Sequence, residues 1–340
     1  MSDDQDVIAK KLASFHDCFV PCKAINEVIN DFAELRDKWR FGGEQECMLI
    51  TGESGSGKTF AVKEYMKSCL PFREGDIVNT PVLFSRIPSD VSLKNTMLEL
   101  LGDLGQFGMS YREGRSGNSS LTESLINLLG KCKVQLVIID EFQELLEFKT
   151  RKEVQRIANR LKLINDKANI PIVLMGTPIC LAIAKEPQWS SRLIRRRNIP
   201  YFSIKDECDD AEFVGVLKGL ANRMPFREPP ELHRDEMRLP LFAACKGEMR
   251  HLKRILENAL SLCLKEGGDC LKINHLSKAY EKVSKGRAYN PFNVKNISDI
   301  KLEFVEKGSG YKYSSDGGEI VPENLEYSKP LSIAEVIRRK

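Results

Sequence analysis

The feature that most constrains this chain is the run Gly52-Glu53-Ser54-Gly55-Ser56-Gly57-Lys58-Thr59. It has the form G-x-x-x-x-G-K-[ST] and lies between an apolar stretch, 47–51, and a helical pattern, 60–69. Glycines at this spacing let backbone N–H groups surround phosphate oxygens at a helix N-terminus. We therefore expect a nucleotide-binding loop that extends to Phe60. In it, Lys58 reaches the β- and γ-phosphates and Thr59 binds Mg²⁺.

A second run, residues 134–141, reads VQLVIIDE. Its apolar residues predict a buried strand whose carboxyl end carries Asp140 and Glu141. Asp140 would hold Mg²⁺, and Glu141 would orient and deprotonate an attacking water. Glu141 could instead be an ordinary solvated helix start, but together with the loop it favours a hydrolase over a kinase.

Two further patterns lie between residues 170 and 197. The strand IPIVLMGT ends at Thr177, a polar residue placed to contact the γ-phosphate or the attacking water; a simple turn at Gly176-Thr177-Pro178 is the alternative. Ser191-Arg192-Leu193-Ile194-Arg195-Arg196-Arg197 holds four arginines and no acid. One of them, with Arg192 and Arg195 favoured, could reach a neighbouring subunit's γ-phosphate. A basic surface stripe or a nucleic-acid face is the alternative.

The order of the predicted elements suggests an α/β core followed by helices. Strands alternate with helices over 46–204, which predicts a mostly parallel five-stranded sheet after an N-terminal helical segment, 1–45. Residues 205–287 read as helices alone and predict a smaller lid domain. There Gly247-Glu248-Met249-Arg250 opens a helix, and Arg250 could reach back to the nucleotide. The tail, 288–340, is rich in Gly, Ser and Lys, and we expect it to be weakly ordered or partner-docking.

These features together resemble the AAA+ ATPases over about residues 20–285, with Thr177 and Arg250 in sensor-like positions. More narrowly, LITGESGSGKT, LVIIDEFQELLE, RKEVQRIANRLKLINDKANIPIVLMGTP and PQWSSRLIRRRNIPYF resemble the TniB/TnsC family of transposition regulators. This resemblance implies an ATP- and Mg²⁺-dependent ATPase that oligomerises as a ring or filament on duplex DNA. It also implies that the protein links a target-selector protein to a transposase and disassembles on hydrolysis. The run GEMRHLKR is more similar to replication initiators and clamp loaders.

The distribution of charge supports a DNA partner. The net charge is only +4, yet residues 151–200 carry +8 and residues 1–50 carry −4. Lys152, Arg156 and Arg160 recur every four residues on one helical face, which could meet phosphates or could be merely solvated. The candidate DNA contacts are Arg112, Arg115, Lys149, Arg151, Lys152 and Arg156. Without a base-reading pattern, we expect binding largely independent of sequence.

Composition excludes several other classes. The 42% hydrophobic and 29% charged fractions are those of a globular protein. The sequence has no membrane-length apolar run, and its start, MSDDQDVIAKK, lacks the basic-then-apolar pattern typical of a signal peptide. We therefore expect a cytoplasmic, nucleoid-associated prokaryotic protein that contacts no membrane. Two alternatives stay open: a clamp-loader or initiator-like loading ATPase, and a nucleotide-gated signalling scaffold that binds no DNA. A zinc site at His16, Cys18 and Cys22 and a docking segment at Asn290-Pro291-Phe292 are weaker possibilities.

Overall fold

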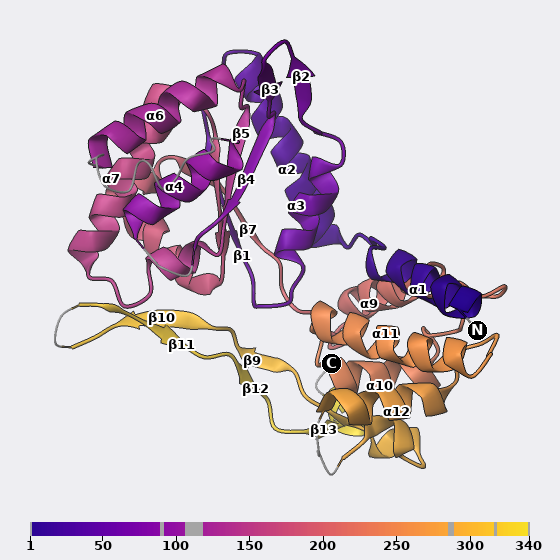
Figure 1. The fold of residues 1–340 in the computed structure, drawn as a ribbon. Helices are drawn as coiled ribbons and strands as arrows, with labels where there is room; N and C mark the ends of the chain where they lie inside the picture. The colour runs from indigo at the N-terminus through magenta and orange to yellow at the C-terminus, as the bar shows by residue number, and fades with distance from the viewer. Residues whose placement is uncertain (1, 89–91, 106–117, 285–288, 316–317, 339–340) are drawn as a thin grey trace. The chain divides into compact units, whose positions relative to one another are not determined.

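The computed structural model forms two compact units. The P-loop unit comprises Ala24–Ile199 and Gly308–Leu325, and the helical unit comprises Met1–Lys23, Pro200–Lys307 and Glu326–Lys340. Figure 1 shows the elements of both units, coloured by residue number. Of the helices described, none is long and apolar enough to span a membrane. The structure describes residues 2–88, 92–105, 118–284, 289–315 and 318–338.

A five-stranded sheet organises the P-loop unit. Its order is β4-β5-β6-β1-β7, and all four neighbouring pairs are parallel. The expected five-stranded parallel sheet is confirmed, although its fifth strand lies within the arginine cluster, at 193–198, rather than after it. Those in the middle are buried at every position, which explains their continuous apolar sequences. Parallel strands end at one edge, so the residues after β1, β5 and β6 lie near one another. The strands are β1 (Cys47–Thr51), β4 (Val82–Arg86), β5 (Leu136–Asp140), β6 (Ile172–Gly176) and β7 (Leu193–Asn198).

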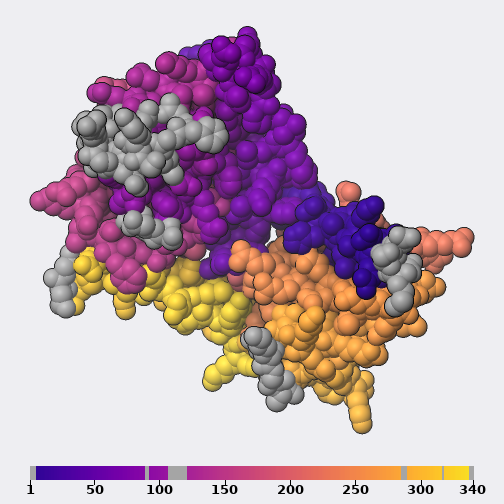
Figure 2. Space-filling model, in the orientation of Figure 1, coloured from indigo at the N-terminus to yellow at the C-terminus, as the bar shows by residue number. Residues whose placement is uncertain are grey.

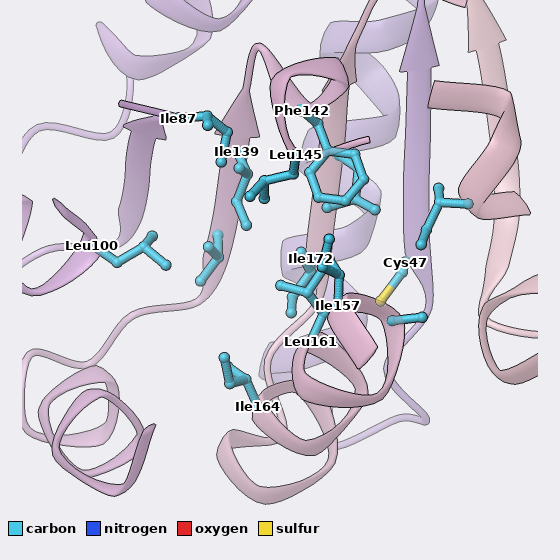
Figure 3. Packing of buried hydrophobic residues seen from close by; sticks show 14 of the residues in the cluster. Cys47, Ile87, Leu100, Ile139, Phe142, Leu145, Ile157, Leu161, Ile164 and Ile172 are labelled. Carbon is cyan, nitrogen blue, oxygen red and sulfur yellow. The ribbon is translucent and has the colours of Figure 1, made fainter. Parts of the chain in front are cut away.

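Amphipathic helices pack against this sheet. The apolar face of α7, with Ile157, Leu161 and Ile164, packs with strand residues such as Ile139 and Ile172 in the core (Figure 3). A capping box begins α7, because Thr150 and Glu153 satisfy each other's backbone N–H groups. A short exposed hairpin, β2 (Phe72–Glu74) and β3 (Ile77–Asn79), was not expected from the sequence. The helices of this unit are α2 (Lys23–Arg40), α3 (Lys58–Met66), α4 (Leu93–Asp103), α6 (Asn118–Lys131), η1 (Phe142–Leu145), α7 (Arg151–Ala168), η2 (Pro178–Lys185) and α8 (Pro187–Ser190).

Over residues 205–284 the helical unit forms four helices, as expected for a stretch that reads as helices alone. Its core includes a cluster of aromatic rings. Phe242 contacts Phe213 edge-on, with ring centroids 5.5 Å apart, and lies tilted against Phe304, with centroids 5.3 Å apart. The elements are α1 (Ser2–His16), α9 (Glu207–Ala221), α10 (Asp235–Cys245), α11 (Met249–Lys265), α12 (Ile273–Ser284), η3 (Pro291–Asn293), η4 (Ile297–Asp299), β8 (Lys301–Leu302), β9 (Val305–Lys307), β12 (Glu326–Tyr327), β13 (Leu331–Ser332) and α13 (Ile333–Arg338).

The two ends of the chain are arranged differently from the sequence prediction. The predicted N-terminal segment is divided: α1 belongs to the helical unit, and nearly all of α2 belongs to the P-loop unit. The tail forms strands rather than a weakly ordered segment. Its hairpin, β10 (Gly310–Tyr313) and β11 (Ile320–Glu323), packs on the P-loop unit, where the side chain of Ile320 is 1% exposed (Figure 2, yellow). Composition did not predict this order, because only a few apolar residues hold the tail in place and most of its residues are polar.

The proposed docking segment at Asn290-Pro291-Phe292 is also packed within its own unit. Phe292 is buried, with its ring centroid 6.0 Å from that of Tyr280. The amide of Asn290 donates to the hydroxyl of Ser277 and to the carboxylate of Glu281. Phe292 is therefore already part of the core of its own unit and is not an exposed anchor for a partner.

Candidate nucleotide site

The loop between β1 and α3 has the geometry of a phosphate cradle. Gly57 has φ +105°, a conformation that L side chains rarely adopt, and it directly precedes α3. The buried ammonium of Lys58 donates to the carbonyl oxygens of Gly52 and Glu53, at 2.7 and 3.0 Å. Burial lowers the pKa of Lys58, while the nearby carboxylates of Asp140 and Glu141 oppose that shift. The cation is thus held at the loop, next to two acids.

Thr59 and Asp140 meet at the carboxyl edge of the sheet. The Thr59 hydroxyl donates to Oδ2 of Asp140 at 2.7 Å, and Oδ1 accepts the backbone N–H of Glu141 at 2.8 Å. Asp140 is 2% exposed; this burial raises the pKa of its carboxyl, and the two hydrogen bonds counteract the rise. A hydroxyl and a carboxylate side by side are the hard oxygen donors that Mg²⁺ prefers, so the expected metal ligands fit the ion.

Two side chains hold Glu141. A guanidinium N–H of Arg86, at the end of β4, donates to Oε1 at 3.0 Å, and the amide of Gln143 donates to Oε2 at 2.7 Å. Glu141 has φ +54°, in the left-handed region. Sequence reasoning missed both partners. The signal for Arg86 was a basic residue ending the strand next to β5, because the register pairs it with Asp140.

Thr177 lies at the tip of β6, as expected. Its backbone N–H donates to Oε1 of Gln143 at 3.1 Å. Its hydroxyl oxygen is buried and has no hydrogen-bond partner among the residues that the structure describes, and the same holds for the hydroxyl of Ser56 in the loop. Buried hydroxyls need hydrogen-bond partners, and a polar ligand at this edge would supply them to Ser56 and Thr177.

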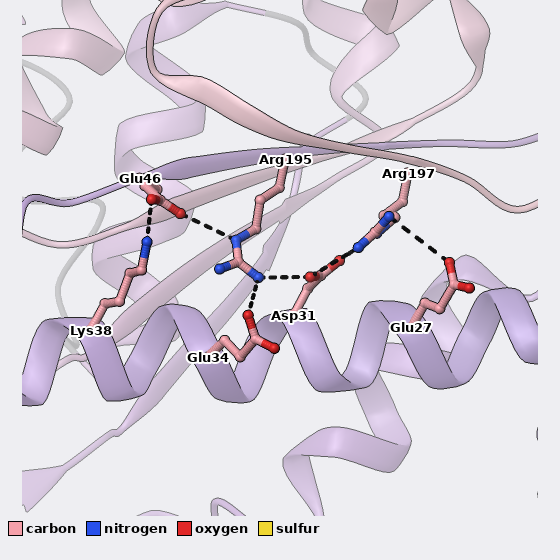
Figure 4. A network of polar contacts seen from close by, with 7 residues as sticks. All are labelled: Glu27, Asp31, Glu34, Lys38, Glu46, Arg195 and Arg197. Carbon is pink, nitrogen blue, oxygen red and sulfur yellow. Dashed lines mark hydrogen bonds and ion pairs between the residues drawn. The ribbon is translucent and has the colours of Figure 1, made fainter.

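The arginine cluster divides into different environments. Arg195 donates to the carboxylates of Asp31, Glu34 and Glu46, and Arg197 donates to Asp31 (Figure 4). These two arginines therefore join β7 to α2. By contrast, Arg192 pairs with Asp166 alone among carboxylates of the described chain, at 2.7 Å, and Arg196 is exposed.

The candidate DNA contacts lie around the start of α7. Arg151, Lys152 and Arg156 are exposed, and Lys149 is half-buried. Arg160 turns inward and donates to the Thr122 hydroxyl at 3.0 Å, so it leaves the stripe expected from the sequence. Arg112 and Arg115 lie outside the described residues.

Two other predictions fall in the helical unit. Arg250 lies in the first turn of α11, and its action on the nucleotide stays a prediction. Nδ1 of His16 lies 3.0 Å from a carboxylate oxygen of Glu257. Among the described residues, no group of three or more His, Cys, Asp or Glu could hold a metal ion.

Comparisons with known structures give the fold. An Aeropyrum pernix ORC1 protein solved in complex with DNA is similar, with a TM-score of 0.59 and 13% identity over 95% of this chain and 93% of that chain. Cdc6p from Pyrobaculum aerophilum gives a TM-score of 0.60 and 12% identity, over 81% and 72% of the chains. A. pernix ORC2, in ADPNP–ADP complexes, gives a TM-score of 0.54 and 17% identity, over 81% of this chain and 72% of that chain.

These likenesses confirm the α/β P-loop fold of AAA+ proteins with a helical region after it. Comparison with curated proteins gave no match. The family model described as "Bacterial TniB protein" matches residues 13–238, about two thirds of the sequence, and this chain therefore belongs to the TniB family.

Proposed function

We propose that this protein is a Mg²⁺-dependent ATPase that assembles on duplex DNA and regulates transposition. One observation carries the chemical part. The loop lysine, the Thr59–Asp140 pair and a doubly held Glu141 converge at one edge of the sheet. Each is a group that phosphoryl transfer to water requires.

The residues have separate roles in this proposal. Lys58 holds the β- and γ-phosphates, and the backbone of 52–58 with the start of α3 at Thr59 and Phe60 cradles the rest. Thr59 and Asp140 would hold Mg²⁺, which neutralises charge on the phosphates. Glu141 accepts the proton of the attacking water. The unsatisfied hydroxyl of Thr177 donates to the γ-phosphate or to that water.

The site is completed by a second copy of the chain. Arg192 is our candidate for the arginine that acts across a subunit boundary, since Arg195 is already bound to three carboxylates. Arg250 responds to the nucleotide from the helical unit. ATP thus favours a homo-oligomer, either a ring or a filament.

The DNA role is supported by charge and by family. Arg151, Lys152 and Arg156 present exposed cations, and the TniB family points to transposition. We propose contacts to phosphates that are largely independent of sequence, together with recruitment of a transposase to a site marked by a target selector. The protein would act in the prokaryotic cytoplasm, at the nucleoid.

The test combines hydrolysis with imaging. Wild type and Glu141→Gln are incubated with random duplex and ATP or a slowly hydrolysed analogue, then examined by gel shift, phosphate release and electron microscopy. We expect both proteins to bind and coat DNA with ATP, and only wild type to release phosphate and disassemble. Unchanged hydrolysis in Glu141→Gln would refute the mechanism.

The same experiment separates the alternatives. A loading ATPase, favoured by the likeness to ORC and Cdc6 folds, would form no extended oligomer on DNA without a second protein. A signalling scaffold would give no shift with either nucleotide.

A further inference from the structure

Gln143 makes two directional contacts in the candidate site. Its amide N–H donates to Oε2 of Glu141 at 2.7 Å, and its carbonyl oxygen accepts the backbone N–H of Thr177 at 3.1 Å. A carboxylate can only accept and a backbone N–H can only donate, so the chemistry fixes the orientation of the amide. The side chain is 5% exposed and cannot trade these partners for bulk water. Gln143 therefore bridges the general base and the tip of β6.

The neighbouring backbone is shaped around this amide. A Cβ atom at Gly176 would lie 2.3 Å from the Gln143 carbonyl oxygen, so any other residue there would push the amide away. Glu141 meanwhile has φ +54°, a conformation that is unfavourable for a residue with a side chain and needs support from its surroundings. Gln143 thus occupies the space that Gly176 leaves free on β6 and also supports Glu141 in its strained conformation.

We propose that Gln143 is a positioning residue that couples Glu141 to Thr177. It rests on the proposed function. When the Thr177 end of β6 shifts against the γ-phosphate, the amide carries that shift to Oε2 of the base. The base is then correctly oriented only when the sensor position is engaged. Since Gln143 contacts Glu141 and Thr177 rather than phosphate, its role concerns turnover more than ATP affinity.

The test compares Gln143→Ala and Gln143→Glu with wild type, with and without duplex DNA. We expect Gln143→Ala to lower kcat by about 10- to 100-fold while KM for ATP stays within about threefold, because a misplaced base slows chemistry without weakening binding. Gln143→Glu places a second carboxylate against Glu141. A carboxylate at this position accepts but cannot donate to Oε2 of Glu141, so we expect kcat to fall at least as far as in Gln143→Ala, with KM for ATP again within about threefold of wild type.

Controls make each outcome decisive. Gln155→Ala, on the exposed face of α7, should match wild type. Thermal unfolding and binding of a fluorescent ATP analogue show whether each variant is folded and loaded. A folded, loaded Gln143→Ala or Gln143→Glu with wild-type kcat overturns the coupling. Wild type without ATPase activity in either condition overturns the proposed function instead.

A second inference concerns the C-terminal hairpin and stands on separate contacts. The backbone N–H of Ser309 donates to Oε1 of Glu53, the second residue of the phosphate-binding loop, at 2.7 Å. The hairpin is anchored firmly. The backbone of Ile320 exchanges hydrogen bonds with Phe148 and Lys149 at 2.8 and 2.9 Å, and the guanidinium of Arg151 lies 4.2 Å from the Tyr313 ring centroid.

We infer that the docked hairpin raises ATP affinity by holding the Glu53 carboxylate away from the phosphates. A free carboxylate in this loop would repel a triphosphate, and the fixed N–H of Ser309 occupies it. Binding linkage is reciprocal, so ATP in turn stabilises the docked hairpin. The hairpin lies in the segment 308–325 of the P-loop unit, and the residues on either side of it, 307 and 326, belong to the helical unit. Through the chain, this segment therefore connects the phosphate-binding loop to the helical unit.

The test removes the donor and then the charge. Ser309→Pro lacks the N–H and should weaken ATP binding about tenfold; adding Glu53→Gln should bring it back to within about threefold of wild type. Lys312→Ala, at an exposed position on β10, three residues after Ser309, is the control. Hydrogen exchange of residues 309–313 in wild type should slow at least about fivefold on ATP binding. Wild-type affinity in folded Ser309→Pro, no recovery in the double variant, or exchange indifferent to bound ATP each overturns the inference.

Discussion

The guanidinium of Arg86 lies 3.0 Å from Oε1 of Glu141, although 55 residues separate them in the sequence. Adjacent parallel strands bring them together, because β4 and β5 end at the same edge and the register sets Arg86 beside Asp140. The Arg86 side chain is 70% exposed, and that of Glu141 is 30% exposed. Such a pair is weak enough to open during a catalytic cycle.

Replacing Arg86 should therefore release the base. We expect Arg86→Ala to raise ATP turnover without DNA about threefold, because the free energy of an exposed ion pair corresponds to a rate change of this size. Arg86→Lys should stay near wild type. Steady-state phosphate release measures this. A fall as deep as that of Glu141→Gln would show that Arg86 supplies a contact the reaction needs.

Asp140 should lower the stability of the folded protein while it provides a ligand for the metal. Burial raises the pKa of its carboxyl, so this group ionises less readily in the folded protein than in the unfolded chain. Its ionisation therefore costs stability progressively as pH rises from the ordinary value of 3.8 through the raised pKa of the folded state. Asp140→Asn removes this cost and should stabilise the nucleotide-free protein at pH 7 by on the order of 1 kcal/mol while abolishing Mg²⁺-dependent hydrolysis.

Denaturant unfolding at several pH values measures the Asp140→Asn effect. The advantage of the variant should shrink as pH falls through the ordinary value of 3.8 and approach zero about one unit below it, where the wild-type carboxyl is protonated in both states. Thr59→Val is a useful companion, since it removes the hydroxyl and keeps the charge of Asp140. An advantage independent of pH would contradict the burial argument.

Arg195 should matter for stability. It is the shared partner of Asp31, Glu34 and Glu46, and the side chain of Asp31 is only 6% exposed. Removing the cation leaves these acids facing one another, with Arg197 still on Asp31. We expect Arg195→Ala to lower the free energy of unfolding by about 1–3 kcal/mol. Arg196→Ala, an exposed neighbour on β7, should change it by less than about 0.5 kcal/mol.

Arg192 should matter for assembled catalysis. Arg192→Ala loses one partly exposed pair with Asp166, so its unfolding free energy should change by less than about 1 kcal/mol. Its hydrolysis in oligomers should fall at least about tenfold. The decisive test mixes Arg192→Ala with Lys58→Ala. At some boundaries of the mixed oligomer, an Arg192→Ala subunit supplies an intact nucleotide site and its Lys58→Ala neighbour supplies an intact Arg192. Failure of the mixture to regain activity would argue against action in trans.

The basic face of α7 should control DNA affinity. Lys152→Ala and Arg156→Ala should each weaken binding uniformly across sequences and reduce the slope of log K against log salt by about one. Gln155→Ala, between them in sequence, should change neither. Fluorescence anisotropy on two unrelated duplexes at several salt concentrations measures both quantities, and an unchanged slope would place the DNA elsewhere.

The sequence by itself predicted the sheet and the residues on its main chemical edge. Asp140 and Thr177 each come directly after an apolar run, and the register of the parallel strands fixes where they lie, while Lys58 follows the glycine-rich loop at the start of α3. These predictions depend on local periodicity and on motif chemistry, which short stretches of sequence contain.

Only the tertiary structure decided the partners of these residues. Arg86, Gln143 and the carboxylates around Arg195 are ordinary polar residues in sequence, and long-range packing alone makes them neighbours of the site or of β7. The tail is the clearest case. Its composition predicts weak order, yet Ile320 is buried in a core formed by residues far earlier in the chain. Burial energy depends on what a side chain meets, and a local pattern does not contain that information.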